Sequence, residues 1–186
     1  LFFENMEASK KNILITGRPR VGKSTLIMRV VEALKRAGCL LGGFYTLEVR
    51  DGGNRIGFNI NTLDGMRGVL ARVGLDSSYR LGKYGIDMGQ FEEVALAALS
   101  DAIDNKEIVV IDEIGYMELK SRRFRELVIR ALESKKPVLA TVMKNRFDFP
   151  DSIKARGDTV VITIRVDNRE TLVDEIVGSL KKLMSL

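Results

Sequence analysis

The chain has no histidine among its 186 residues and only one cysteine, Cys39. The absence of histidine excludes a histidine general base, histidine metal ligands and a Ser-His-Asp triad, so acid–base chemistry must use Asp, Glu, Lys, Tyr or water. A single cysteine cannot form an intramolecular disulfide, so the cysteine content gives no support to an oxidising compartment. A carboxylate is then the plausible catalytic base.

Long apolar runs are also absent, and none approaches the roughly 18 residues that a membrane span requires. The first residues, LFFENMEASKK, do not show the basic segment followed by an apolar segment that is typical of a secretory signal. We therefore expect a cytoplasmic protein that does not enter a membrane. The length and a hydrophobic content of 45% predict one domain, residues 1–186, with a sizeable core.

The net charge of +5 results from 30 basic and 25 acidic residues. An excess of this size fits a polyanionic partner, but it also fits an ordinary solvated surface of mixed sign. The charge therefore leaves nucleic-acid binding open without supporting it.

Apolar runs alternate with amphipathic segments along most of the chain. Continuous apolar runs predict strands at 12–16, 108–112, 137–142 and 159–166, and apolar residues at helical spacing predict helices at 23–37, 91–103, 121–132 and 167–184. Because strands that alternate with helices form right-handed crossovers, this order predicts an α/β fold with a mostly parallel sheet flanked by helices.

The segment GGFYTLEVRDGGNRIGFNIN interrupts this alternation. Its runs 43–49 and 55–60 flank Asp51-Gly52-Gly53, the residue types that a tight turn requires, so we expect an inserted antiparallel β-hairpin. After it, VLARV (69–73) fits either a strand or a helical turn. The Gly- and Tyr-containing segment LGKYGIDMG (81–89) is expected to be a loop.

The segment GRPRVGKS lies between a predicted buried strand and a predicted helix. It matches the P-loop pattern G-x-x-x-x-G-K-[ST] at Gly17, Gly22, Lys23 and Ser24. Glycines let backbone N–H groups turn toward an anion, and the positive end of the helix dipole points to the same place. We expect Lys23 to reach the β- and γ-phosphates of a nucleotide and Ser24 to give its hydroxyl to Mg²⁺.

An acidic pair follows the apolar run 108–112. Asp112, at the carboxyl end of a buried strand, is placed to hold the hydration shell of Mg²⁺. Glu113 either orients or deprotonates an attacking water, or only caps the strand end and faces solvent. A carboxylate next to the metal-binding Asp is typical of hydrolytic P-loop proteins, which carry an extra strand between the loop strand and the acidic strand. Thr141 would then contact the γ-phosphate or the water, or be a plain buried threonine.

Further segments carry a more specific pattern: GFYTLEVRDGGNRIGF, GKYGIDM, DEIGYMELKS and DNRETL follow GRPRVGKSTL in this order. This series resembles the THEP nucleoside-triphosphatase family, also called the cancer-related NTPase family, from Ile13 to about Ile176. The resemblance implies a single-domain RecA- or AAA-like P-loop NTPase core. It also implies Mg²⁺-dependent hydrolysis of ATP, GTP and other nucleoside triphosphates with limited base selectivity.

The resemblance assigns metal binding to Ser24 and Asp112 and water activation to Glu113, and it places Asn168 and Arg169 near the base. The residues that it assigns to the phosphates are Gly17, Arg18, Pro19, Arg20, Val21, Gly22, Lys23, Ser24 and Thr25. Glu48, Arg50 and Arg55 match the family pattern without an assigned role. The chain departs from the pattern at Arg20, where a glycine is common, and at Met143-Lys144, where the family often has a histidine.

An arginine that neutralises the transition state accelerates phosphoryl transfer by about 10³–10⁵-fold in proteins that have one. Each arginine of this chain also fits an ordinary solvated surface position. The candidates for such a role are Arg20, Arg50, Arg55, Arg146 and Arg156, of which we favour Arg55 because it follows the hairpin turn.

Three other functions fit parts of the sequence. For a GTP-specific switch, DEIG (112–115) matches D-x-x-G, and NRFD (145–148) approaches the guanine-reading N-K-x-D although Arg replaces its Lys. A nucleotide or small-molecule kinase would use Glu113 on an acceptor hydroxyl, but no arginine-rich lid is visible. The basic segment KSRRFR (120–125) would suit a nucleotide-gated module that binds RNA or protein, but on an amphipathic helix it more often forms a wet outer face.

Overall fold

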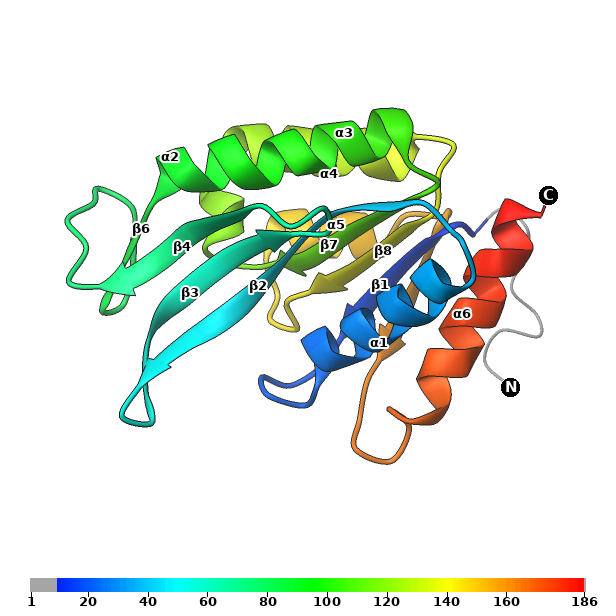
Figure 1. Ribbon diagram of the computed structural model, residues 1–186, viewed down its shortest axis with the longest axis horizontal. Coiled ribbons are helices and arrows are strands. Elements are labelled where there is room, and N and C mark those ends of the chain that lie inside the picture. Colours follow the sequence, from blue (N-terminus) through cyan, green and yellow to red (C-terminus); the bar gives the residue numbers. More distant parts are fainter. Residues whose placement is uncertain (1–9, 186) are drawn as a thin grey trace.

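The computed structural model describes residues 10–185 as one nine-stranded sheet with helices on both faces (Figure 1). The strands are β1 (Asn12–Thr16), β2 (Leu41–Asp51), β3 (Asn54–Thr62), β4 (Arg67–Val73), β5 (Arg80–Leu81), β6 (Tyr84–Ile86), β7 (Ile108–Ile114), β8 (Val138–Val142) and β9 (Thr159–Thr163). The helices are α1 (Lys23–Arg36), α2 (Met88–Gln90), the π-helix η1 (Phe91–Leu96), α3 (Ala97–Asn105), the 3₁₀ turn η2 (Glu118–Lys120), α4 (Arg122–Glu133), α5 (Asp148–Lys154) and α6 (Thr171–Met184).

Five strands form the parallel half of the sheet, in the order β2-β7-β8-β1-β9. The expected extra strand is confirmed, because β8 separates the strand before the P-loop, β1, from the acidic strand, β7. Since these strands are parallel, the P-loop, the acidic pair and Thr141 all emerge at the same edge.

The other half of the sheet is antiparallel, in the order β5-β6-β4-β3-β2. The expected hairpin is confirmed as β2 and β3, with Glu48 opposite Phe58 and a register shift between Val49 and Arg50. VLARV (69–73) is a strand, and it extends the hairpin as part of β4.

The expectation that residues 81–89 are a loop was wrong for part of the segment. Residues 84–86 form β6, which pairs with β4 and is fully buried. Its neighbour β5 adds a short strand at the sheet edge. A three-residue strand is too short for an alternating pattern, so its pairing comes from packing against β4 instead of from a local signal.

Three predicted boundaries moved where polar side chains bond the backbone. The helix expected from residue 91 begins at Met88, where the Asp87 side chain accepts a hydrogen bond from the Gln90 amide. The strand expected to reach residue 166 ends at Thr163, and the last helix begins at Thr171. The loop between them is closed by Asn168, whose side chain accepts from the Arg165 amide at 2.8 Å and donates to the Thr163 carbonyl at 3.1 Å.

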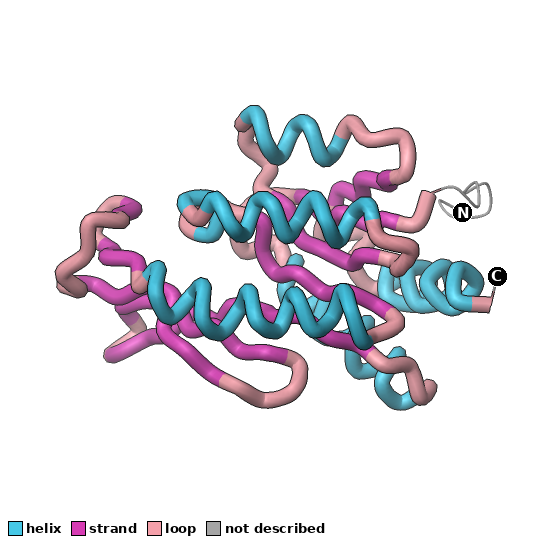
Figure 2. Tube along the Cα trace, turned by 90° about the horizontal axis from the view of Figure 1, so that it is seen from above, coloured by secondary structure: helices cyan, strands magenta, loops and turns pink. Residues whose placement is uncertain are grey.

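The two faces of the sheet have separate apolar cores. Helices α1 and α6 cover one face, and η1, α3, α4 and α5 cover the other (Figures 1 and 2). On the second face the fully buried rings of Phe44, Phe91 and Phe124 meet edge to face, with centroids 5.4–6.0 Å apart. This cluster fixes β2 against η1 and α4. Within residues 10–185, no helix is both long enough and apolar enough to cross a membrane.

Gly43 in β2 provides a test of how tightly β2 packs on β7. Its φ is +115°, and a Cβ there would lie 2.0 Å from the Val110 carbonyl oxygen. We expect Gly43→Ala to lower the free energy of unfolding by about 3 kcal/mol or more, measured by urea denaturation with circular dichroism. Gly52→Ala is the matched control, because Gly52 also has a positive φ, +52°, but open space around it. Gly52→Ala should lower the free energy of unfolding by only about 1 kcal/mol. Equal losses for the two variants would contradict the close approach of β2 to β7.

Candidate functional site

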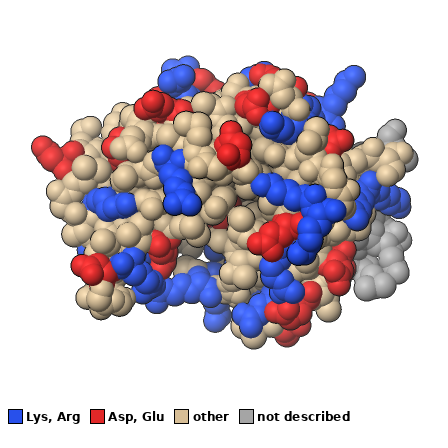
Figure 3. Space-filling view, viewed as in Figure 1, with Lys and Arg blue, Asp and Glu red and all other residues tan. Residues whose placement is uncertain are grey.

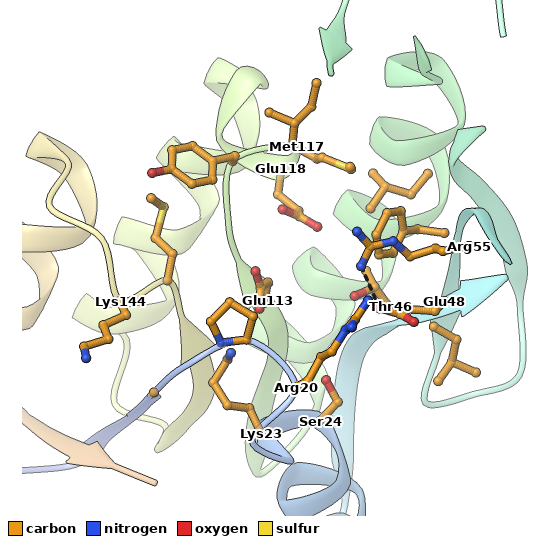
Figure 4. Close-up of a pocket in the computed structure, with 18 of the residues that line it drawn as sticks. Arg20, Lys23, Ser24, Thr46, Glu48, Arg55, Glu113, Met117, Glu118 and Lys144 are labelled. Carbon is orange, nitrogen blue, oxygen red and sulfur yellow. Dashed lines mark hydrogen bonds and ion pairs between the residues drawn. The ribbon is translucent and has the colours of Figure 1, made fainter. Parts of the chain in front are cut away.

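A cavity of about 930 Å³ opens where β1, β7 and β8 end. One wall is the P-loop between β1 and α1, and the opposite wall comes from β2 and β3. The segments that follow β7 and β8 complete it (Figure 4). The P-loop, Glu113 and the hairpin therefore come together around one space.

The P-loop presents backbone N–H groups to this cavity. Gly22, with φ +103°, precedes α1, and no side chain caps the first turn of that helix. The first amides of α1 therefore have no partner in the helix and are available to an anion. Lys23 and Arg20 both extend into the cavity, Arg20 from a left-handed backbone position with φ +63° (Figure 4).

Most but not all residues assigned to the phosphates line the cavity. Arg18 is exposed and Val21 packs against the core on the α1 face, and neither contributes to the lining. The assigned residues that do line it are Gly17, Pro19, Arg20, Gly22, Lys23, Ser24 and Thr25.

Asp112 is completely buried at the end of β7. Its Oδ1 accepts a hydrogen bond from the Thr141 hydroxyl on β8. Burial raises the pKa of the Asp112 carboxyl, whereas hydrogen bonds from Thr141 and Ser24 and the charge of Lys23 lower it. The structure thus brings the two predicted metal ligands, Ser24 and Asp112, together and gives Thr141 a defined contact with one of them.

The donor set at Asp112 fits Mg²⁺. The second carboxylate oxygen, Oδ2, is buried and has no hydrogen-bond partner among the described residues. No group of three or more Cys, Asp or Glu side chains that could hold a metal occurs between residues 10 and 185. One carboxylate and one hydroxyl are the few protein ligands that Mg²⁺ takes when phosphate oxygens supply others.

Glu113 is half-buried and faces the cavity beside the P-loop (Figure 4). Burial raises the pKa of its carboxyl, the Lys23 charge lowers it and the Asp112 charge raises it. The side chain therefore lines the cavity together with Lys23.

Sequence reasoning missed Glu118, which also lines the cavity although only 4% of it is exposed. Burial, followed by repulsion from Glu113, raises the pKa of Glu118 to about 8. The sequence did contain a signal for the burial of Glu118, because this residue lies between the apolar residues Met117 and Leu119 in the DEIGYMEL segment. A glutamate flanked by buried apolar residues carries a burial penalty that a surface position would avoid.

The five arginine candidates separate into two groups. Arg20 and Arg55 line the cavity, and Arg55 donates to Glu48 at 2.8 Å and to the Tyr84 hydroxyl at 3.0 Å. Arg50 bonds Glu48 and the Gly53 carbonyl near the hairpin tip, and Arg146 does not line the cavity. Arg156 does not line the cavity, because it pairs with Asp158 before β9, at the opposite edge of the sheet.

The remaining predicted residues lie outside the cavity lining. Asn168 uses its side chain within its own loop, and Arg169 pairs with Glu170 at 3.6 Å. The basic segment 120–125 forms ion pairs from Arg122 to Glu126 and from Arg123 to Glu92. Basic and acidic side chains also stand side by side on the face of the molecule seen in Figure 3.

Comparison with known proteins identifies the family. The model of the NTPase family matches residues 12–177. The nucleoside-triphosphatase THEP1 of Thermotoga sp. (strain RQ2) is 48% identical over 169 residues, which cover 91% of this chain and 95% of that protein. The chain belongs to this nucleoside-triphosphatase family. The human cancer-related nucleoside-triphosphatase is 38% identical over 184 residues, with 90% and 95% covered.

Two solved structures of the family share the fold. The crystal structure of THEP1 from Aquifex aeolicus matches with a TM-score of 0.80 at 33% identity, covering 91% of this chain and 99% of that one. The solution structure of the human cancer-related nucleoside triphosphatase matches with a TM-score of 0.80 at 38% identity, covering 92% and 98%. The P-loop NTPase fold predicted from the sequence is confirmed. At the departure from the family pattern, Met143 and Lys144 line the cavity.

The hydrogen bond between Thr141 and Asp112 provides a test of this arrangement. Thr141→Val keeps the shape of the side chain but removes the donor to a buried carboxylate, so we expect the free energy of unfolding to fall by about 1–3 kcal/mol in urea denaturation. Thr163→Val, at the exposed end of β9, is the control and should change stability little. Equal stability of the two variants would show that the bond contributes nothing.

Proposed function

We propose that the protein is a Mg²⁺-dependent nucleoside triphosphatase that hydrolyses ATP, GTP and other nucleoside triphosphates to the diphosphate and phosphate. One observation carries the proposal: Glu113 lines one cavity with Lys23 and Ser24, and the buried Asp112 beside it is within hydrogen-bond reach of Ser24. The names of the relatives, nucleoside-triphosphatases, support the same activity.

Binding of the triphosphate would use the P-loop. The uncapped first turn of α1 offers its amides to the phosphates, and Lys23 adds a positive charge in the cavity. Ser24 and Asp112 would hold Mg²⁺, which, when bound, neutralises charge on the β- and γ-phosphates. The loop that contains Asn168 and Arg169 precedes α6, and at its start the Ile164 amide donates a hydrogen bond to the Thr16 carbonyl just before the P-loop, so we assign this loop to the base side of the nucleotide.

Hydrolysis would use Glu113 as the group that orients the attacking water and accepts its proton. The water oxygen attacks the γ-phosphorus in line as the bond to the β,γ-bridging oxygen breaks, and the diphosphate leaves with that oxygen. Lys23 and the amides of the P-loop stabilise the charge that develops on the phosphoryl oxygens. Burial of Glu113 favours proton acceptance, since a raised pKa makes the carboxylate a stronger base.

Two substitutions separate binding from chemistry. We expect Lys23→Ala to weaken nucleotide binding and abolish turnover. Glu113→Gln should lower kcat by about 10²-fold or more because it removes the proton acceptor, yet leave nucleotide binding largely intact. Phosphate release gives kcat, and titration calorimetry with ATP gives the dissociation constant. Glu126→Gln, an exposed glutamate on α4, is the control, and strong hydrolysis by Glu113→Gln would refute the role of Glu113.

Base selectivity distinguishes this proposal from a GTP-specific switch. Asn145, the first residue of the partial guanine motif, donates to the Tyr116 hydroxyl at 3.1 Å, so its amide has a partner inside the protein. We expect kcat/KM for ATP and GTP to agree within about tenfold, which corresponds to 1.4 kcal/mol. A preference for GTP above a thousandfold would support the switch. Phosphate release from ATP without any acceptor distinguishes hydrolysis from a kinase.

A further inference from the structure

Two carboxyl groups in the cavity face the same small space beside Gly115. Glu113 is the penultimate residue of β7, and after a short turn Glu118 begins η2. A Cβ on Gly115 would lie 2.6 Å from Glu113 Oε1 and 3.0 Å from Glu118 Oε2. Figure 4 shows both carboxyl groups entering the cavity on the same side, next to each other. Only a residue without a side chain leaves these two oxygens facing one gap.

Glu118 has no cation beside it that would explain its burial. No ion pair or side-chain hydrogen bond joins it to another side chain in the part of the chain that the structure describes. A buried carboxylate without a cation is costly, so such a group takes up a proton instead. The hydrophobic core alone would be served better by a leucine or methionine at this position, since both are apolar and of similar size.

We propose that Glu118 is a positioning residue for hydrolysis, which holds the carboxylate of Glu113, directly or through one water molecule, in the orientation that activates the attacking water. The inference rests on the proposed function, because it acts through Glu113. It assigns no contact between Glu118 and the nucleotide, and it explains why a buried glutamate lines the cavity.

The proton on Glu118 supports this role. With its pKa raised to about 8, mainly by burial and then by Glu113, the carboxyl group is mostly protonated at neutral pH and can donate a hydrogen bond. The amides of Gly115 and Glu118 lower the pKa less than burial raises it. Above pH 8, Glu118 loses its donor and gains a charge that repels Glu113, so hydrolysis should decline on the alkaline side.

Other charged groups face the same space. From β7, Asp112 adds negative charge that raises the pKa of Glu118. Lys23 acts on Glu113 from α1. The rest of the cavity wall contributes Arg20, Glu48, Arg55 and Lys144. Of these groups, Glu118 is the carboxyl whose pKa is raised to about 8. A change in kcat near pH 8 that disappears when Glu118 is substituted is therefore assigned to Glu118.

The test compares Glu118→Gln with Glu118→Leu in the full chain. Glutamine keeps a permanent N–H donor in place of the protonated acid, whereas leucine fills the volume without a donor. We expect Glu118→Leu to lower kcat by about 10–100-fold with the dissociation constant for ATP changed less than twofold. Glu118→Gln should recover at least tenfold of that loss and should remove the alkaline decline near pH 8.

Gly115→Ala tests the same geometry without replacing either carboxyl group. Its methyl group would enter the gap between them, so kcat should fall while ATP binding is retained. The matched controls are Glu126→Gln and Glu126→Leu on exposed α4, which should leave both kcat and its pH profile as in the parent. If Glu118→Leu does not fold, Gly115→Ala and the pH profile of Glu118→Gln decide the question.

The outcomes separate the two proposals. Parent-like kcat in Glu118→Leu or Gly115→Ala, together with an inactive Glu113→Gln, would overturn the role of Glu118 alone. Loss of activity in Glu118→Gln as complete as in Glu113→Gln would also overturn it, because Glu118 would then act as a base. Full hydrolysis by Glu113→Gln would instead remove the proposed function on which the inference rests.

Discussion

The insertion of β8 between β1 and β7 is the constraint on which the site depends. In the parallel register, Leu14 of β1 pairs with Ala140 of β8, and Ala140 pairs with Ile111 of β7. Just beyond these pairs, where the β7–β8 register shifts between Ile111 and Ile114, the Thr141 hydroxyl donates a hydrogen bond to Asp112. A slip of one residue in either pairing would move one of these side chains to the opposite face of the sheet. The register therefore places the acidic pair opposite the P-loop before any ligand binds.

The same arrangement concentrates charge in a poorly solvated place. Asp112, Glu113 and Glu118 all have raised pKa values with burial as the leading cause, and Lys23 is the nearby charge that opposes this for the first two. A site selected only for stability would replace such groups by apolar residues, because desolvation of a carboxylate exceeds what one neighbour returns. Perturbed carboxyl groups that gather in one cavity are instead typical of sites where charge is used in a reaction.

Particular residues show which parts of the fold and of the candidate site could be predicted from the sequence. The P-loop and Asp112–Glu113 are local patterns, in which each residue type follows from phosphate or metal chemistry at fixed spacing. The extra strand, β8, was predicted because Glu113 follows Asp112, and a carboxylate at that position is typical of hydrolytic P-loop proteins with such a strand. The sequence predicted β2 and β3 as a hairpin but not as a wall of the cavity. Their position opposite the P-loop depends on the pairing between β2 and β7, which no local pattern records. The strand β6 and Glu118 were missed for a related reason, since long-range packing buries both.

The antiparallel extension of the sheet forms one wall of the cavity that Glu113 lines. Strands β2 and β3 contribute Thr46, Phe58 and the Arg55–Glu48 pair to the cavity wall, and Phe58 and Tyr84 flank the Arg55 guanidinium with centroids 5.1 and 5.7 Å away. A cavity closed on this side strengthens every electrostatic interaction within it, because solvent screening is reduced. The hairpin thus contributes to the chemistry through the environment of the carboxyl groups.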